Sequence, residues 1–128
     1  MGRLVAIAAV LLLATVARGE TAVDWAKAEP VSVLMLDNRF VPDHLTLQHD
    51  RPYLLQVENL GSNEHQFTAS SFLGAAVLRD PALSANEVIV VPPGGAIDLY
   101  LVPIRAGSFP LRCAEHELDG MVGEIVVE

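Results

Sequence analysis

The sequence predicts an all-β domain, either a β-sandwich or a small barrel. From Val31 onward apolar and polar residues alternate in short runs, and a period of two is typical of half-buried strands. Pro, Gly, Asn and Asp separate these runs and supply turns. Seven or eight short strands at this spacing fit a sandwich or small barrel. The length of 128 residues indicates a single domain.

The strands follow one another with little intervening sequence. The predicted strands are Val31–Leu36, Leu45–Gln48, Tyr53–Glu58, His65–Ala69, Val88–Val91, Ala96–Val102, Phe109–Cys113 and Ile125–Val127. Tyr53, Leu55 and Val57 share one face of their strand, which marks that face as part of the core. The predicted turns are Asp37-Asn38, Asp50–Pro52, Asn59–Asn63, Pro92–Gly95 and Arg105–Gly107.

One segment, Ser70–Asn86, breaks the alternation and is long for a plain loop. We expect an insertion here, with a helical turn near Phe72–Leu78.

The N-terminal residues have the three-part layout of a secretory signal peptide. Arg3 supplies positive charge, Leu4–Val16 is an uninterrupted apolar or small-residue run, and Ala17-Arg18-Gly19 offers small residues for cleavage. The run is shorter than the about 20 residues that a membrane span needs, although an uncleaved anchor is the alternative. We therefore predict a signal peptide at 1–19, an N-terminal tail or short helix at 20–30, and the domain at 31–128.

The charge balance is acidic, with a net charge of −8 for the whole chain. Without Arg3 and Arg18, six Lys and Arg oppose sixteen Asp and Glu. An acidic chain disfavours nucleic acid, which binds basic surfaces, and favours basic protein partners or simply solubility. No second long apolar run follows the first, so we expect no membrane span in the mature chain. The predicted signal peptide indicates the periplasm, and we expect a monomer there.

Three residues near the C-terminus carry the chemistry of the chain. Cys113, His116 and Met121 lie within nine residues, at the end of one predicted strand and on the loop before the last. A copper site for electron transfer combines a Cys thiolate, two imidazoles and a weak thioether ligand. His65, which follows the turn Asn59–Asn63, is the candidate for the second imidazole. Together they predict one mononuclear copper ion held by His65, Cys113, His116 and Met121.

These residues also allow other interpretations. Zinc prefers Cys, His and carboxylate ligands, so Met121 favours copper. Each residue taken singly has an ordinary structural role, since a lone Cys or Met often fills a core. Cys113 is also the chain's one cysteine, so it has no intrachain disulfide partner. In an exported protein, ligation to a metal explains why such a thiol stays unpaired.

The Cys-x2-His-x4-Met spacing resembles that of plastocyanin and pseudoazurin, members of the blue copper or cupredoxin family. The segment Gly120–Val127 is similar to the family's last loop and strand, Phe40–Leu47 to an early strand of periplasmic cupredoxins, and Asn59–Phe67 to the turn before the first His ligand. The resemblance covers about residues 31–128. It implies a Greek-key β-sandwich of seven to eight strands with the copper ion under one end.

The chain departs from the resembled family at two places. Gln66 occupies the position where many blue copper proteins have Asn, and Ser70–Asn86 has no counterpart in the smallest members. His44 and His49 are interpreted as exposed loop or strand-edge residues, with His44 kept as an alternative metal contact.

Three functions are compatible with the sequence. The first is one-electron transfer, with a periplasmic redox partner such as a cytochrome with a basic face. The second is copper storage, delivery or resistance, and the third is a metal-free interaction module. A catalytic role is not expected, since the chain has no nucleophile elbow and no phosphate-binding Gly loop.

Overall fold

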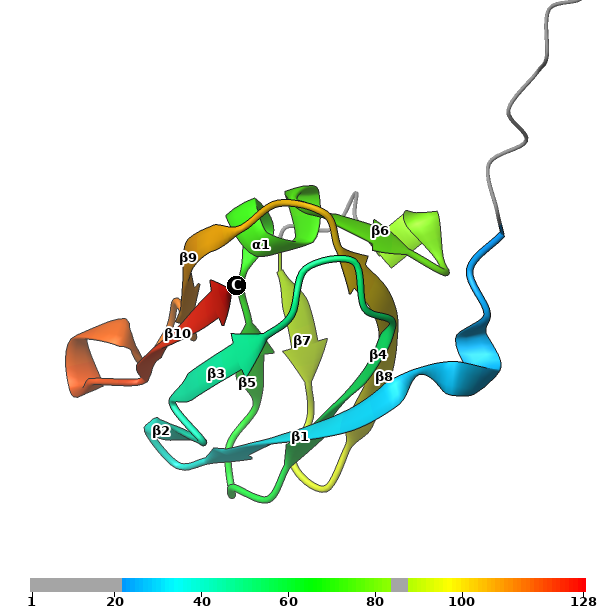
Figure 1. Cartoon of the computed structure of the whole chain (residues 1–128). Helices are drawn as coiled ribbons and strands as arrows, with labels where there is room; N and C mark the ends of the chain where they lie inside the picture. The colour runs from blue at the N-terminus through cyan, green and yellow to red at the C-terminus, as the bar shows by residue number, and fades with distance from the viewer. Residues whose placement is uncertain (1–21, 84–87) are drawn as a thin grey trace, which may run out of the picture.

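The computed structural model describes residues 22–83 and 88–128, which form a β-sandwich of ten strands (Figure 1). The strands are β1 (Glu29–Leu36), β2 (Arg39–Val41), β3 (His44–Leu47), β4 (Tyr53–Asn59), β5 (His65–Phe67), β6 (Ala76–Leu78), β7 (Ile89–Val91), β8 (Ala96–Pro103), β9 (Gly107–Arg112) and β10 (Val122–Val127). The short helix α1 (Ser70–Gly74) and three 3-10 turns, Trp25–Lys27, Pro81–Leu83 and Glu117–Asp119, complete the described elements. The predicted all-β sandwich is confirmed.

The strands form two layers. One is a five-stranded sheet in the order β2-β1-β4-β8-β6. The other contains the sheet β3-β10-β9 and the pair β5-β7. Thr68 and Arg112 exchange backbone hydrogen bonds of 3.0 Å and so connect the end of β5 to the end of β9. This junction lies directly before Cys113, which places the Cys where the two parts of the second layer meet.

The core follows from the alternation in the sequence. On β4, Tyr53, Leu55 and Val57 are buried, and Leu55 lies opposite Leu99 of β8 in the antiparallel register. Burial of each such Leu or Val side chain stabilises the fold by about 1.5–3 kcal/mol. The same apolar cluster includes Cys113 and Met121, two of the predicted ligands.

One parallel strand pair positions the turns beside the site. β1 and β4 are parallel neighbours, with Met35 opposite Asn59 at the ends of the pair. Because both strands run in the same direction, the turn after β1 and the turn after β4 lie at the same end of the sheet, where the two strands finish. Asp37 of the first turn thereby comes within hydrogen-bond distance of Ser62 in the second.

Several predicted elements are shifted in the structure. The helical turn predicted near Phe72–Leu78 begins earlier and forms α1 at Ser70–Gly74. The prediction of helix for the second half of Phe72–Leu78 is wrong. Residues 76–78 instead form β6, because their backbone pairs with the edge of β8. β2 was not predicted as a strand. It has only three residues and depends on pairing with the end of β1 rather than on its own alternation.

The N-terminal predictions fall partly outside the described residues. Residues 1–21, which include the whole predicted signal peptide, lie outside the described residues. The division into signal peptide, tail and domain at 19 and 30 stays a prediction. Within the described part, Trp25–Lys27 forms a single 3-10 turn and β1 begins at Glu29, two residues before the predicted strand. No helix among residues 22–83 and 88–128 has the length and apolar character to cross a membrane.

Candidate metal site

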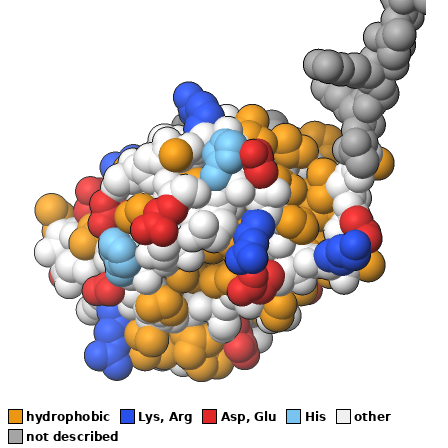
Figure 2. Space-filling model, in the orientation of Figure 1, with side chains coloured by type: hydrophobic (Ala, Val, Ile, Leu, Met, Phe, Trp, Pro, Cys, Tyr) orange, Lys and Arg blue, Asp and Glu red, His pale blue; other side chains and the backbone are white. Residues whose placement is uncertain are grey.

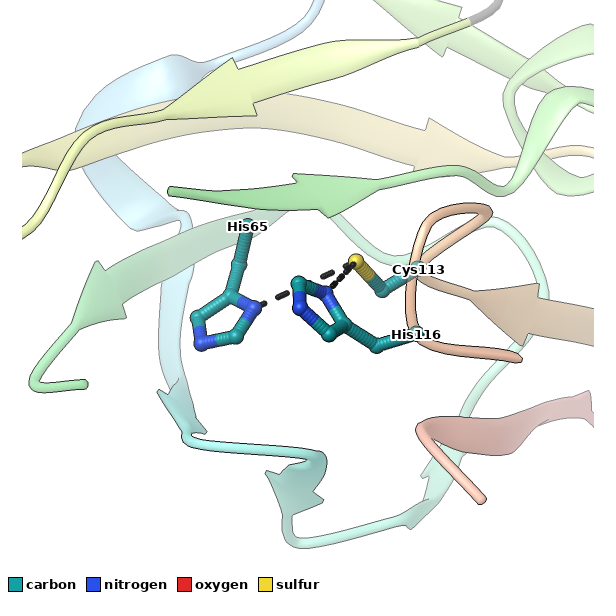
Figure 3. A group of neighbouring side chains, drawn as sticks. All are labelled: His65, Cys113 and His116. Carbon is teal, nitrogen blue, oxygen red and sulfur yellow. Dashed lines mark hydrogen bonds between the residues drawn. The ribbon is translucent and has the colours of Figure 1, made fainter. Parts of the chain in front are cut away.

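Three of the predicted ligands converge on one point (Figure 3). The Cys113 Sγ atom lies 3.4 Å from Nδ1 of His116 and 4.0 Å from Nδ1 of His65. The two imidazole rings meet edge to face, with their centroids 4.9 Å apart. His65 and Cys113 are fully buried and His116 is half-buried, so the cluster has one side near solvent. His65 and His116 thus present the same kind of nitrogen to the sulfur.

The spacing of these atoms fits a bound metal ion. Metal bonds of about 2.3 Å to sulfur and about 2.0 Å to nitrogen, at near-tetrahedral angles, hold the two ligand atoms about 3.5 Å apart. The observed sulfur–nitrogen distances of 3.4 and 4.0 Å bracket that value. The donor set of one thiolate and two imidazoles is the set that suits copper, and it leaves a further position for a weak ligand.

The loop between β9 and β10 brings Cys113, His116 and Met121 together through its backbone. The His116 N–H donates to the Cys113 carbonyl at 3.1 Å, and the Met121 N–H donates to the His116 carbonyl at 3.1 Å. The Cys113 N–H in turn donates to the Met121 carbonyl at 3.1 Å. This closed set of bonds fixes the spacing of the three residues. Gly120, with φ of +89°, turns the chain back after the 3-10 turn Glu117–Asp119.

Met121 lies at the base of this loop. Its side chain is fully buried and belongs to the same apolar cluster as Cys113. Met121 therefore lies on the buried side of the loop. The ligand atoms that the structure groups within 4.8 Å of one another are those of His65, Cys113 and His116.

The His65 ring is held from its far side by Asp37. The Nε2 atom of His65 lies 3.2 Å from Oδ1 of Asp37. The same carboxylate accepts hydrogen bonds from the Ser62 backbone N–H at 2.9 Å and from the Ser62 hydroxyl at 2.6 Å. The bonds from Ser62, the hydroxyl first, lower the pKa of Asp37 from 3.8 to about 2. At neutral pH this carboxylate is therefore ionised and acts as an acceptor only.

A buried amide holds the turn that carries His65. The Asn59 side chain donates to the carbonyls of Asn63 and Val91 at 2.8 and 2.9 Å and accepts from the Gly61 N–H at 2.9 Å. A Cβ atom at Gly61 would lie 2.4 Å from Oδ1 of Asp37 and 2.9 Å from Nε2 of His65. Glycine at this position therefore leaves room for the contact between Asp37 and His65, because a side chain would push one of the two aside.

Gln66 connects the His65 strand to the ligand loop. Its backbone N–H donates to the Cys113 sulfur at 3.4 Å, and its side-chain amide donates to Glu115 at 3.4 Å. The substitution of Gln for Asn noted in the sequence is therefore compatible with a brace across the site.

The remaining histidines lie outside this cluster. His44 is exposed on β3 and pairs with Glu124 at 3.2 Å, while exposed His49 pairs with Asp50 at 2.7 Å. Among the described residues, the grouped ligand atoms do not include those of His44. The interpretation of both residues as exposed is confirmed.

Sequence reasoning missed three residues of this site. Asp37 was interpreted only as part of a turn, and Asn59 and Ser62 only as turn residues before His65. Asp37 and His65 are 28 positions apart, and only the parallel register of β1 and β4 brings them together. The sequence offered one signal for Asp37, namely an acidic residue directly after the predicted strand Val31–Leu36. It gave no sign that this residue lies beside the turn before His65.

Comparison with known families identifies the class of protein. The sequence matches the cupredoxin-like domain family over residues 3–127, so the chain belongs to that family. A search of curated proteins found no significant match.

Three solved structures illustrate the shared fold. Reduced auracyanin from Roseiflexus castenholzii aligns with a TM-score of 0.59 at 12% identity, covering 79% of this chain and 98% of that one. Oxidised plastocyanin from Dryopteris crassirhizoma gives 0.53 at 14%, covering 77% and 100%. The metal-binding domain of a Cu(I)-exporting P-type ATPase from Streptococcus pneumoniae, solved with Cu(I), gives 0.52 at 12%, covering 80% and 87%. At these identities the likeness is one of fold.

Proposed function

We propose that this protein is an exported one-electron carrier that binds a single copper ion through His65, Cys113, His116 and Met121. The observation that carries the proposal is the convergence of Nδ1 of His65, Nδ1 of His116 and Sγ of Cys113 within 4.8 Å of one another. Membership of the cupredoxin-like family supports copper as the metal.

The residues of the chain hold the ion in a fixed environment. Bound copper supplies a Cu(I)/Cu(II) couple, and thiolate, thioether and imidazole ligands together suit both oxidation states. Buried His65 and Cys113 exclude water from one side of the site. The backbone bonds of the ligand loop and the Asp37 contact restrict ligand movement, which keeps the rearrangement small when an electron is exchanged.

His116 is the proposed route for electrons. It is half-buried, in contrast to fully buried His65, and its loop carries Leu118, which is fully exposed. Val122, 47% exposed, adds apolar surface at the start of β10, directly after that loop. An exposed apolar surface next to a ligand gives a redox partner a place to approach without a deep cleft.

The proposed partner is a periplasmic redox protein, for example a cytochrome with a basic face. Without the predicted signal peptide, six Lys and Arg oppose sixteen Asp and Glu, and this acidic balance would attract such a partner at long range. The face shown in Figure 2 mixes acidic and basic side chains with apolar ones, so on this face the attraction would come from the net charge rather than from a uniform acidic patch. Periplasmic location rests on the signal-peptide pattern at 1–19. Electron exchange between proteins requires no catalysis by this chain.

A copper titration followed by electron exchange tests the proposal. The wild-type protein should bind one equivalent of Cu(II), develop a strong visible absorption, lose it on reduction, and exchange electrons with a basic cytochrome in stopped-flow mixing. The His44→Gln variant should behave like the wild type, because His44 pairs with Glu124 outside the cluster. Absence of copper binding would refute the proposal.

Copper delivery is the second candidate function. It is favoured by the shared fold with the metal-binding domain of a Cu(I)-exporting ATPase. In that case the protein would bind Cu(I) and transfer it to an acceptor, but would not cycle with a cytochrome. Copper binding without repeated electron exchange would replace the first function with this one.

A further inference from the structure

We propose that Asp37 is the positioning residue of the copper site, fixing the tautomer of His65 and lowering the reduction potential of the bound ion. This inference rests on the proposed function, since it assigns a role to a residue behind one proposed ligand. Asp37 touches His65 and none of the other three ligands in the hydrogen bonds of the described residues.

The geometry of the His65 ring determines which nitrogen carries the proton. Nε2 faces the Asp37 carboxylate at 3.2 Å, and a carboxylate only accepts, so Nε2 must donate. In a neutral imidazole the proton on Nε2 leaves the lone pair on Nδ1. Nδ1 is the nitrogen that faces the Cys113 sulfur at 4.0 Å. The ring is thus held ready to bind a metal through Nδ1.

Asp37 is itself held in place before any metal binds. Its Oδ1 accepts from the Ser62 N–H and its Oδ2 accepts from the Ser62 hydroxyl. Gly61 leaves the space that the contact needs, since a Cβ there would collide with both Asp37 and His65. A carboxylate anchored by its neighbours and aimed at the outer nitrogen of a ligand histidine forms a carboxylate–histidine–metal arrangement.

This arrangement has an electronic consequence. A carboxylate hydrogen-bonded to a ligand imidazole raises the basicity of that ligand. A more basic ligand and a nearby negative charge both favour the ion with the higher positive charge, which is Cu(II) over Cu(I). Asp37 therefore lowers the reduction potential. Since its side chain is 45% exposed, solvent reduces the effect of the charge but not of the direct hydrogen bond.

The test compares Asp37→Asn and Asp37→Ala with a charge control. Asp37→Asn keeps the size and an accepting oxygen but removes the charge, whereas Asp37→Ala removes both. Glu64→Gln removes one negative charge from the exposed residue next to His65 and leaves the Asp37 contact in place. The readouts are the nitrogen-15 NMR spectrum of the histidines in copper-free protein, the Cu(II) affinity, and the reduction potential.

The expected results differ among the three variants. In Asp37→Ala, His65 should no longer be held in the Nε2-protonated tautomer alone, and both tautomers should appear. This variant should also bind Cu(II) about 10–100-fold more weakly. Asp37→Asn should keep the tautomer and shift the reduction potential upward. Glu64→Gln should keep the tautomer and the affinity and shift the potential less than Asp37→Asn does.

Two outcomes would overturn the proposal. The first is an unchanged His65 tautomer and affinity in Asp37→Ala. The second is a potential in Asp37→Asn no higher than that of Glu64→Gln. If Asp37→Ala does not fold, Asp37→Asn still decides the electronic part. If wild-type protein binds no copper, the proposed function and the claim on the potential both fail, while the NMR spectrum of copper-free protein still tests whether Asp37 fixes the tautomer.

Discussion

The two halves of the candidate site are built by different means. On one side, His65 is fixed by side chains from distant parts of the chain, namely Asp37 behind the ring and Asn59 beneath the turn. On the other side, Cys113, His116 and Met121 are fixed by the backbone of one short loop. The position of His65 depends on the pairing of β1 with β4, whereas the other three ligands lie within nine residues of one another. Mutations on the His65 side therefore act through contacts between side chains, and mutations in the loop act through the backbone conformation.

The largest expected effect comes from the residue at which the halves meet. Cys113→Ser removes the only thiolate available to the ion, while the Gln66 N–H and both histidines remain. We expect the strong visible absorption to disappear. We also expect the Cu(II) affinity to fall further than the loss of about 10–100-fold that is typical when a residue hydrogen-bonded to a ligand is removed. Competition with a chelator measures the affinity. Retention of near-wild-type affinity would show that the ion binds elsewhere.

The second effect concerns the side-chain half. Gly61→Ala places a Cβ 2.4 Å from Asp37 Oδ1, so the turn or the carboxylate must move. We expect a loss of about 1–3 kcal/mol in the free energy of unfolding, measured by urea denaturation of copper-free protein. The matched control is Gly74→Ala in α1, where a Cβ meets nothing within 4 Å. The control should be as stable as wild type or up to about 1 kcal/mol more stable. Equal destabilisation of both variants would contradict the role assigned to Gly61.

The third effect concerns the backbone half. Gly120→Ala meets no atom within 4 Å, but its φ of +89° is strained for a residue with a Cβ. We expect a cost of about 1–2 kcal/mol from backbone strain alone. Because the Asp37–His65 contact is untouched, copper affinity should fall less than in Gly61→Ala. A chelator competition on both variants measures this order, and the reverse order would mean that the loop, not the His65 side, limits binding.

The smallest effect is one of pH on the copper-free protein. The pKa of Asp37 is lowered from 3.8 to about 2, chiefly by the Ser62 hydroxyl. As pH falls, the unfolded chain therefore takes up the Asp37 proton before the folded chain does. The contribution of Asp37 to stability is fully present above about pH 4 and is lost as pH falls toward about 2. Asp37→Asn should flatten the acid-side decline measured by urea midpoints, and an unchanged slope would contradict the assigned shift.

The difference between the halves also explains what the sequence could predict. The sandwich followed from alternation such as Tyr53, Leu55 and Val57, which is a local signal. The spacing of Cys113, His116 and Met121 is local as well, and the structure does bring the first two together with His65. Ligation by these residues remains a prediction.

The parts that sequence reasoning missed depend on contacts between distant segments. Asp37 reaches His65 only because β1 and β4 are parallel neighbours. Residues 76–78 form a strand only because the edge of β8 is available to pair with them. Three-residue strands such as β2 and β6 are too short for alternation to identify. Register and edge pairing are properties of the assembled sheet, so no spacing within one segment indicates them.

The most direct test of the account is a crystal structure of the copper-loaded protein. We expect one ion bound by Nδ1 of His65, Nδ1 of His116, Sγ of Cys113 and the thioether sulfur of Met121, with Asp37 still bonded to Nε2 of His65. An ion bound at His44 and Glu124 instead, or a His65 ring flipped to bind through Nε2, would contradict it.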